Sequence, residues 1–153
     1  YNEKLIIFIK KVSHNPVLSI SAGILLTAIF QSSSLTSVFL VLIARLAHID
    51  LKPAALIIIG ANIGTCATSI IASFWANRNA KKAALFHLFY NIIGAIFVIC
   101  IFPLYIHIVN YVSPHEIGNQ IANAHTIFNI LSAVIVLPLL DIILNFINTL
   151  LAE

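Results

Sequence analysis

A polar break interrupts the first long hydrophobic run of the chain. Residues 16–30 are mainly apolar, the four hydrogen-bonding side chains of Gln31–Ser34 follow, and residues 35–47 are apolar again. Lipid cannot satisfy hydrogen bonds, so polar groups at membrane depth are tolerated only inside protein or beside a water-filled cavity. The pattern therefore predicts a site at the break, one that handles something polar.

The two apolar arms that flank the break predict a helical hairpin over residues 15–47. At about 1.5 Å of rise per residue, each arm is roughly 20 Å long as a helix. A hydrocarbon core is about 30 Å thick and takes about 20 residues to cross, so neither arm spans it alone. A re-entrant hairpin with the break at its tip and one long broken helix both fit this pattern, and we favour the hairpin.

A second interrupted segment covers residues 53–76. Its apolar run is broken by Gly-Ala-Asn-Ile-Gly-Thr, which begins at Gly60. Gly60 and Gly64 stand four residues apart, a spacing typical of tight packing between membrane helices. Packing alone does not require Asn62 or Thr65, so this segment is also a candidate for a site.

Two further stretches, residues 83–109 and 120–151, are long enough to be transmembrane helices, with kinks expected at Pro103 and Pro138. Lys and Arg gather on the cytoplasmic side of membrane proteins, which places a short basic loop inside and a loop without Lys or Arg outside. The remaining segments are therefore predicted as an interfacial lead-in, an inner loop and an outer loop: residues 1–14, 77–82 and 110–119.

The composition is that of a membrane protein. Hydrophobic residues make up 61% of the chain and charged residues 8%, with a mean hydropathy of +1.06. Soluble domains carry about 25% charged residues, so this chain could not cover a water-exposed surface. We expect an all-α membrane protein with a single membrane domain over residues 1–153. Because the sequence starts at Tyr1, contains no Met and shows no cleavable signal pattern, we expect an internal or C-terminal piece of a longer protein.

Several classes of function lack their signatures in this sequence. The net charge of +3 comes without the basic stripe that nucleic-acid binding needs. Serine hydrolases use a Gly-x-Ser-x-Gly elbow, which is missing, and the histidines and cysteines show no metal-ligand spacing. Cys66 and Cys100 are interpreted as small buried residues. We therefore predict that the protein is not an enzyme and needs no cofactor or metal other than a coupling ion.

A short motif occurs twice in the second half of the chain. His87 and Asn91, and again His125 and Asn129, form His-x-x-x-Asn. Residues four apart share one face of a helix. Such polar pairs in membrane helices either tie helices together by hydrogen bonds or line a pathway, and we favour the structural role.

The polar break has the chemistry of an anion site. If a helix begins at Leu35, the serines form its cap and first turn, where free N–H groups and the positive end of the helix dipole attract anions. The Gln31 amide can donate to an oxyanion or offer its oxygen to a cation. Secondary transporters place substrate and ion sites on broken helices in this way. Neutral oxygens that suit sodium better than a proton relay come from Thr27, Thr36, Ser37, Asn62, Thr65 and Thr68.

These motifs resemble the type II sodium-dependent phosphate cotransporter family, including its bacterial members. The resemblance is carried by Gln31–Ser34 followed by Gly60–Thr65, and Lys81–His87 and His125–Asn129 also fit it. It covers most of the chain, which is similar to the second of two Gln-Ser-Ser-Ser repeats in that family.

The resemblance implies inverted repeats that meet at a shared substrate site in a multi-pass protein of the cell membrane. Transferred to this sequence, phosphate would be held by Gln31, Ser32, Ser33 and Ser34. Sodium would be held by Gln31, Ser34, Asn62 and Thr65. The chain has one such stretch, so its partner would be the missing first repeat or an inverted copy of itself. Cys66 and Ala67 depart from the family, which often has a second Thr or Ser there.

The sequence thus predicts sodium-coupled symport of inorganic phosphate across the lipid bilayer by alternating access, with this chain as one half-site. Two alternatives stay open. One is a membrane helical module for packing or assembly, without transport. The other is a transporter or exporter of another small anion.

Overall fold

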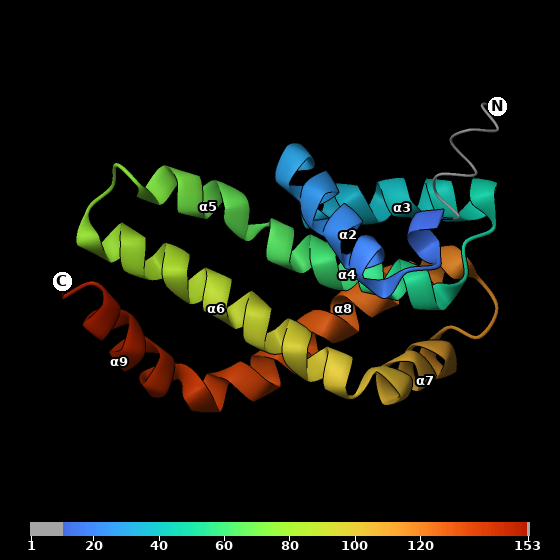
Figure 1. Ribbon diagram of the computed structural model, residues 1–153. Coiled ribbons are helices and arrows are strands. Elements are labelled where there is room, and N and C mark those ends of the chain that lie inside the picture. Colours follow the sequence, from blue (N-terminus) through green and yellow to red (C-terminus); the bar gives the residue numbers. More distant parts are fainter. Residues whose placement is uncertain (1–10, 153) are drawn as a thin grey trace.

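The computed structural model describes residues 11–152, and this part of the chain is helical, without strands (Figure 1). The prediction of an all-α fold is confirmed. Residues 1–10, most of the predicted lead-in, lie outside the described residues. The elements in chain order are α2 (Pro16–Phe30), α3 (Ser33–Ala47), α4 (Leu51–Gly64), α5 (Cys66–Ser73), α6 (Arg78–Cys100), α7 (Phe102–Val112), α8 (Ile117–Val136), the 3-10 turn η1 (Leu137–Leu139) and α9 (Leu140–Leu150).

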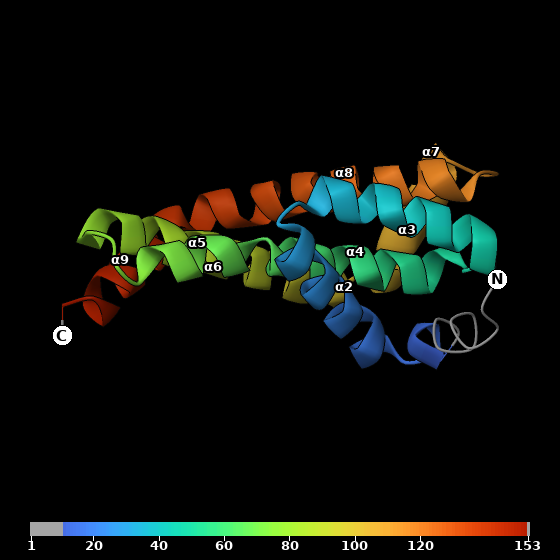
Figure 2. The same cartoon turned by 90° about the horizontal axis from the view of Figure 1, so that it is seen from above.

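Helices α2 and α3 form the predicted hairpin, whose arms diverge as a V (Figures 1 and 2). The α2 helix begins where the Asn15 side chain accepts hydrogen bonds from the first free N–H groups, with Pro16 in the first turn. It ends at Gln31, whose backbone is left-handed with φ 57°. The chain therefore reverses at the polar break, and the hairpin rather than one long broken helix is the correct arrangement.

The α2 arm lies directly on α4 through glycines. A Cβ atom added to Gly60 would lie 2.0 Å from the backbone oxygen of Ile20, and one added to Gly23 would lie 2.0 Å from that of Ile57. Gly64 faces the backbone of Ile24 in the same way, at 2.5 Å. Close packing of helix backbones is what the spacing of the two glycines in α4 predicts.

The second interrupted segment is broken later than its polar residues suggest. Helix α4 continues through Gly60 and Asn62 to Gly64, and Thr65 alone separates it from α5. The Thr65 backbone stays right-handed and its N–H still donates to the carbonyl oxygen of Ala61, 3.2 Å away. The glycines fit inside this helix because the α2 backbone lies directly against them, and Asn62 fits because its buried side chain donates to the carbonyl oxygen of Ile58.

Three helical segments of the described chain are long and apolar enough to cross a membrane: Leu51–Ser73, Arg78–Cys100 and Ile117–Leu150. The first joins α4 to α5, and the last joins α8 to α9 through a 3-10 turn at Pro138, where a kink was expected. The other expected kink falls at Ile101, between α6 and α7, two residues before Pro103. In Figure 1 the chain turns from α5 back along α6, and α8 crosses behind.

The prediction of a basic loop at residues 77–82 is wrong. Arg78, Lys81 and Lys82 lie in the first turns of α6. The helix begins early because the Asn77 side chain accepts a hydrogen bond from the N–H of Ala80, at 3.0 Å.

The core lies where α4, α6, α7 and α8 meet. Tyr105 and Phe128 are fully buried there, and the Tyr105 hydroxyl donates to the carbonyl oxygen of Ala124 at 2.7 Å. At the crossing of α6 and α8, Gly94 makes room for the buried Ser132 side chain, since a Cβ at Gly94 would lie 2.2 Å from the Ser132 hydroxyl oxygen. This packing holds the long helices against the hairpin and α4.

Candidate functional site

The hairpin tip presents the start of α3. Ser32 is the N-cap residue, and its Oγ accepts a hydrogen bond from the N–H of Leu35 at 3.2 Å. Ser33 and Ser34 form the first helical turn, two residues before the start expected at Leu35. The helix begins early because serine is a favoured N-cap, so a polar stretch marks a helix start rather than a gap.

The polar groups of the tip differ in exposure. Gln31 and Ser34 are exposed, while Ser32 and Ser33 are partly buried. Among the described residues, neither the Ser33 nor the Ser34 hydroxyl makes a side-chain hydrogen bond, so both are available to a ligand. Together with the first-turn N–H groups and the helix dipole, they make the tip suited to an anion.

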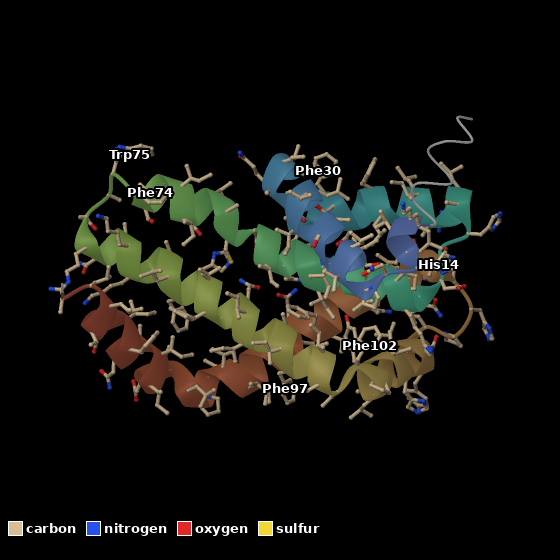
Figure 3. All side chains as sticks on the ribbon, viewed as in Figure 1. His14, Phe30, Phe74, Trp75, Phe97 and Phe102 are labelled. Atoms are coloured by element: carbon tan, nitrogen blue, oxygen red, sulfur yellow. The ribbon has the colours of Figure 1, made fainter. Side chains whose placement is uncertain are left out.

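A pair of buried threonines lies beneath the tip. The hydroxyl oxygens of Thr27 in α2 and Thr36 in α3 are 2.8 Å apart, and both side chains are fully buried. Thr36 donates to the carbonyl oxygen of Ser32 at 3.0 Å, so the shared hydrogen comes from Thr27. The ring of Phe30 at the end of α2 packs edge-on against Phe39 of α3, with centroids 5.3 Å apart (Figure 3). These contacts fix the angle between the arms.

The polar residues of the second segment are engaged within their own helix. The buried Asn62 side chain donates to the carbonyl oxygen of Ile58 at 2.9 Å, and the Thr65 hydroxyl donates to that of Asn62 at 2.6 Å. Within residues 11–152, no hydrogen bond joins them to Gln31–Ser34. The connection is by packing, because a Cβ at Gly64 would lie 3.0 Å from the Cβ of Thr27, one turn before the tip.

Two long-range contacts of α3 were not predicted from the sequence. The Ser37 hydroxyl, one turn after Ser33, lies 3.3 Å from Nδ1 of His125 in α8. At the other end of α3, Arg45 forms a salt bridge of 2.5 Å with Glu116, which precedes α8. The repeated His-x-x-x-Asn motif indicated that His125 forms a polar contact between helices. No local sequence pattern indicates that Ser37 is its partner.

The Glu116 carboxylate is stabilised by its neighbours. The hydrogen bond from Arg45 and the one from the N–H of Asn119 lower the pKa of Glu116 below its ordinary value of 4.5. The group is exposed to solvent, so its contribution to stability is small. Its place is structural: it caps α8 and ties that helix to the end of α3.

Comparison with known proteins identifies the family of the chain. The model of the Na+/Pi-cotransporter family matches residues 1–119, a range that includes the hairpin and α4–α5. A relative described as "Uncharacterized protein YqeW", from Bacillus subtilis (strain 168), is 31% identical over 129 residues. That alignment covers 84% of this chain and 42% of the relative, so the chain spans less than half of the relative's length. No solved structure matches the chain. The chain therefore belongs to the Na+/Pi-cotransporter family, a family of transporters and not of enzymes.

Proposed function

We propose that this chain supplies one of two phosphate half-sites of a sodium-coupled symporter in the cell membrane. The observation that carries the proposal is the serine-rich start of α3 at the tip of a hairpin, within a chain of the Na+/Pi-cotransporter family. Phosphate would receive hydrogen bonds from Gln31, Ser32, Ser33 and Ser34. The Ser32 hydroxyl oxygen already accepts the N-cap hydrogen bond from Leu35. It would keep this bond through one lone pair and donate its hydrogen to phosphate.

Sodium is the proposed coupling ion, and neutral oxygens near the tip are its candidate ligands. Gln31 and Ser34 can reach a ligand at the tip because both are exposed. Asn62 and Thr65 donate their side-chain hydrogens to backbone carbonyl oxygens of α4, and sodium would bind instead to the lone pairs of Asn62 Oδ1 and Thr65 Oγ1. In this proposal, sodium offsets the negative charge of phosphate in the low-dielectric membrane interior.

Transport requires a second half-site, because a single tip offers donors from one side only. We propose that the partner is a first repeat or an inverted copy of this chain, and that the two move by alternating access around the shared site. The three candidate spans and the exposed apolar surface of α2 and α3 fit a multi-pass protein surrounded by lipid.

One observation favours a second candidate function, a helical module for packing or assembly. Gly60, Gly64 and Asn62 all make contacts inside the chain, which is what a packing module requires. The unpaired hydroxyls of the partly buried Ser33 and the exposed Ser34 are not explained by packing, and they favour transport.

Uptake of radiolabelled phosphate into proteoliposomes tests the proposal. The chain is reconstituted alone and together with the first-repeat half of a family member, with an inward sodium gradient and with potassium in its place. Sodium-dependent uptake in either preparation supports a half-site, and the preparation that is active identifies the partner. No uptake in either, with folded protein confirmed by circular dichroism, contradicts the proposal. Competition by sulfate or other anions separates phosphate from another cargo.

A further inference from the structure

The two His-x-x-x-Asn motifs make the same contact with two different helices. In α8, Nδ1 of His125 lies 3.3 Å from the hydroxyl of Ser37 in α3. In α6, Nδ1 of His87 lies 3.4 Å from the hydroxyl of Ser69 in α5. Each histidine therefore reaches a serine on the helix that follows one of the two breaks, the polar tip or Thr65.

The direction of these hydrogen bonds follows from the serines. Ser37 donates its only hydrogen to the carbonyl oxygen of Ser33, at 2.8 Å, and Ser69 donates to that of Cys66, at 2.9 Å. Each serine oxygen can then only accept from the imidazole. Nδ1 must therefore carry the hydrogen in both His125 and His87, because the partner of one ring nitrogen sets the tautomer.

The asparagines of the motifs hold the histidine-bearing turns. Asn129 donates to the carbonyl oxygen of His125 at 2.9 Å, and Asn91 to that of His87 at 3.0 Å. Asn91 also lies 3.4 Å from Sγ of Cys66, and His87 contacts Ser69, so the α6 motif contacts both ends of the first turn of α5. The same two-residue arrangement thus recurs, with a side-chain amide on the helix and an imidazole directed at a neighbour.

The contact between His125 in α8 and Ser37 is linked to the proposed phosphate site by a single hydrogen bond of Ser37. The carbonyl oxygen that accepts from Ser37 belongs to Ser33, in the first turn of α3. The Arg45–Glu116 salt bridge holds the other end of α3 on the start of α8, in the antiparallel register that the Ser37–His125 contact requires. Loss of the imidazole would remove the α8 contact nearest the serines, while the salt bridge would still hold the far end of α3 to α8.

We propose that the two motifs are positioning sites. His125 fixes the position of the serine-rich start of α3, and His87 fixes the position of α5 after the second break. Neither histidine touches the proposed substrate. The positioning effect on phosphate rests on the proposed function, whereas the contacts themselves do not. His125 acts on phosphate binding and His87 does not, because only Ser37 leads to the tip.

Nitrogen NMR of the chain labelled with 15N-histidine, in detergent micelles, tests the contacts without any transport assay. We expect neutral His125 and His87 to carry hydrogen on Nδ1. Ser37→Ala should shift the His125 signals toward the Nε2–H tautomer and leave those of His87 unchanged, and Ser69→Ala should do the reverse. Each serine variant is the matched control for the other. Histidine signals that do not respond to their own serine would overturn the proposal.

Phosphate uptake by the active preparation tests the positioning role. His125→Leu should raise the phosphate KM about three- to tenfold, the usual worth of one hydrogen bond, with a smaller change in kcat. His125→Asn, whose side-chain amide can donate from near the position of Nδ1, should recover most of the phosphate affinity that His125→Leu loses. At saturating sodium, His87→Leu should leave the phosphate KM close to that of the wild type, because its Ser69 contact leads to Cys66, beside the proposed sodium ligand Thr65, and not to the tip. Equal KM increases in the two leucine variants would overturn the assignment of His125 to the tip. A wild-type preparation without sodium-dependent uptake would contradict the proposed function, and the tautomer shifts would still decide the contacts.

Discussion

Single side chains decide where the hairpin turns and which groups it presents. Gln31 adopts a left-handed backbone conformation, and its N–H closes α2 by donating to the carbonyl oxygen of Thr27 at 2.7 Å. Ser32 then starts α3 by capping Leu35. The sequence located this turn correctly from its four polar residues. The predicted start of α3, Leu35, was two residues late. The prediction followed the first apolar residue, which indicates burial, whereas the helix begins directly after its capping serine.

Removing one tip hydroxyl should weaken phosphate binding without unfolding the protein. Ser33→Ala takes away a donor that has no partner in the described structure but keeps the backbone oxygen that accepts from Ser37. We expect the phosphate KM to rise about two- to tenfold, as for the loss of one hydrogen bond, with unchanged expression. Uptake kinetics across a phosphate titration measure this.

The matched control for that substitution is Ser73→Ala, which removes a hydroxyl engaged at the end of α5. It should leave the phosphate KM unchanged. A phosphate titration in which the Ser33 variant coincides with the wild type would count against the tip as the site.

The Arg45–Glu116 pair gives a defined dependence of stability on pH. The pKa of Glu116 is lowered in the folded protein, chiefly by the hydrogen bond from Arg45, so the folded state binds a proton less tightly than the unfolded state does. The contribution to stability is therefore present above pH 4.5, the ordinary value, and is lost as pH falls below it. We expect Glu116→Gln to lower the melting temperature slightly at neutral pH and not at all at the acidic end. Thermal unfolding in detergent micelles measures the difference, and a gap between the two proteins that widens on acidification would contradict the assignment.

At the scale of elements, the α2–α4 contact is the most constrained part of the fold. The backbones touch at Gly23, Gly60 and Gly64. The arm at residues 16–30 and the role of the two α4 glycines could be predicted, because apolar runs and small-residue spacing are local signals. The early start of α6 was not predicted, because the polar composition of residues 77–82 is typical of a loop, whereas Asn77 is the N-cap of a helix.

Adding one methyl group at that contact should destabilise the hairpin. A Cβ at Gly60 would lie 2.0 Å from the backbone oxygen of Ile20, which cannot move without displacing α2. We expect Gly60→Ala to lower the free energy of unfolding by about 1–3 kcal/mol, the usual cost of overpacking, although alanine favours helix more than glycine does. Chemical unfolding in mixed micelles gives the value.

The control is Gly118→Ala, in the first turn of α8. There the three atoms nearest to an added Cβ belong to the ends of the Glu116 and Arg45 side chains, at 2.9–3.0 Å, and these flexible side chains can shift. We expect no loss of stability. Equal destabilisation by the two substitutions would contradict the claim that the contact with the α2 backbone is what makes glycine necessary at residue 60.

At the scale of the whole molecule, the described helices form an elongated body that α2 crosses at an angle (Figures 1 and 2). The α5–α6 turn and the C-terminal end of the described chain share one end, and the α7–α8 turn lies at the other (Figures 1 and 2). Phe74 and Trp75 are exposed at the first end, beside the basic start of α6, where aromatic side chains favour a membrane interface (Figure 3). Two of the three candidate spans, near the predicted stretches 83–109 and 120–151, were expected from hydropathy, and the third joins α4 to α5. The contacts of α3 with α8 were not predicted, because hydropathy gives which residues are apolar but not which helix faces meet.

Protection from chemical labelling is the direct test of the proposed binding of phosphate at the hairpin tip of this chain. Leu35→Cys introduces a thiol beside the tip and leaves Gln31–Ser34 intact; Leu35 is 50% exposed. The native thiols at Cys66 and Cys100 are first replaced by alanine. In the preparation that takes up phosphate, we predict that labelling by a small thiol reagent slows as phosphate rises in sodium buffer, and that chloride at equal ionic strength has no effect. A labelling rate that stays constant at phosphate concentrations that saturate uptake would contradict the account.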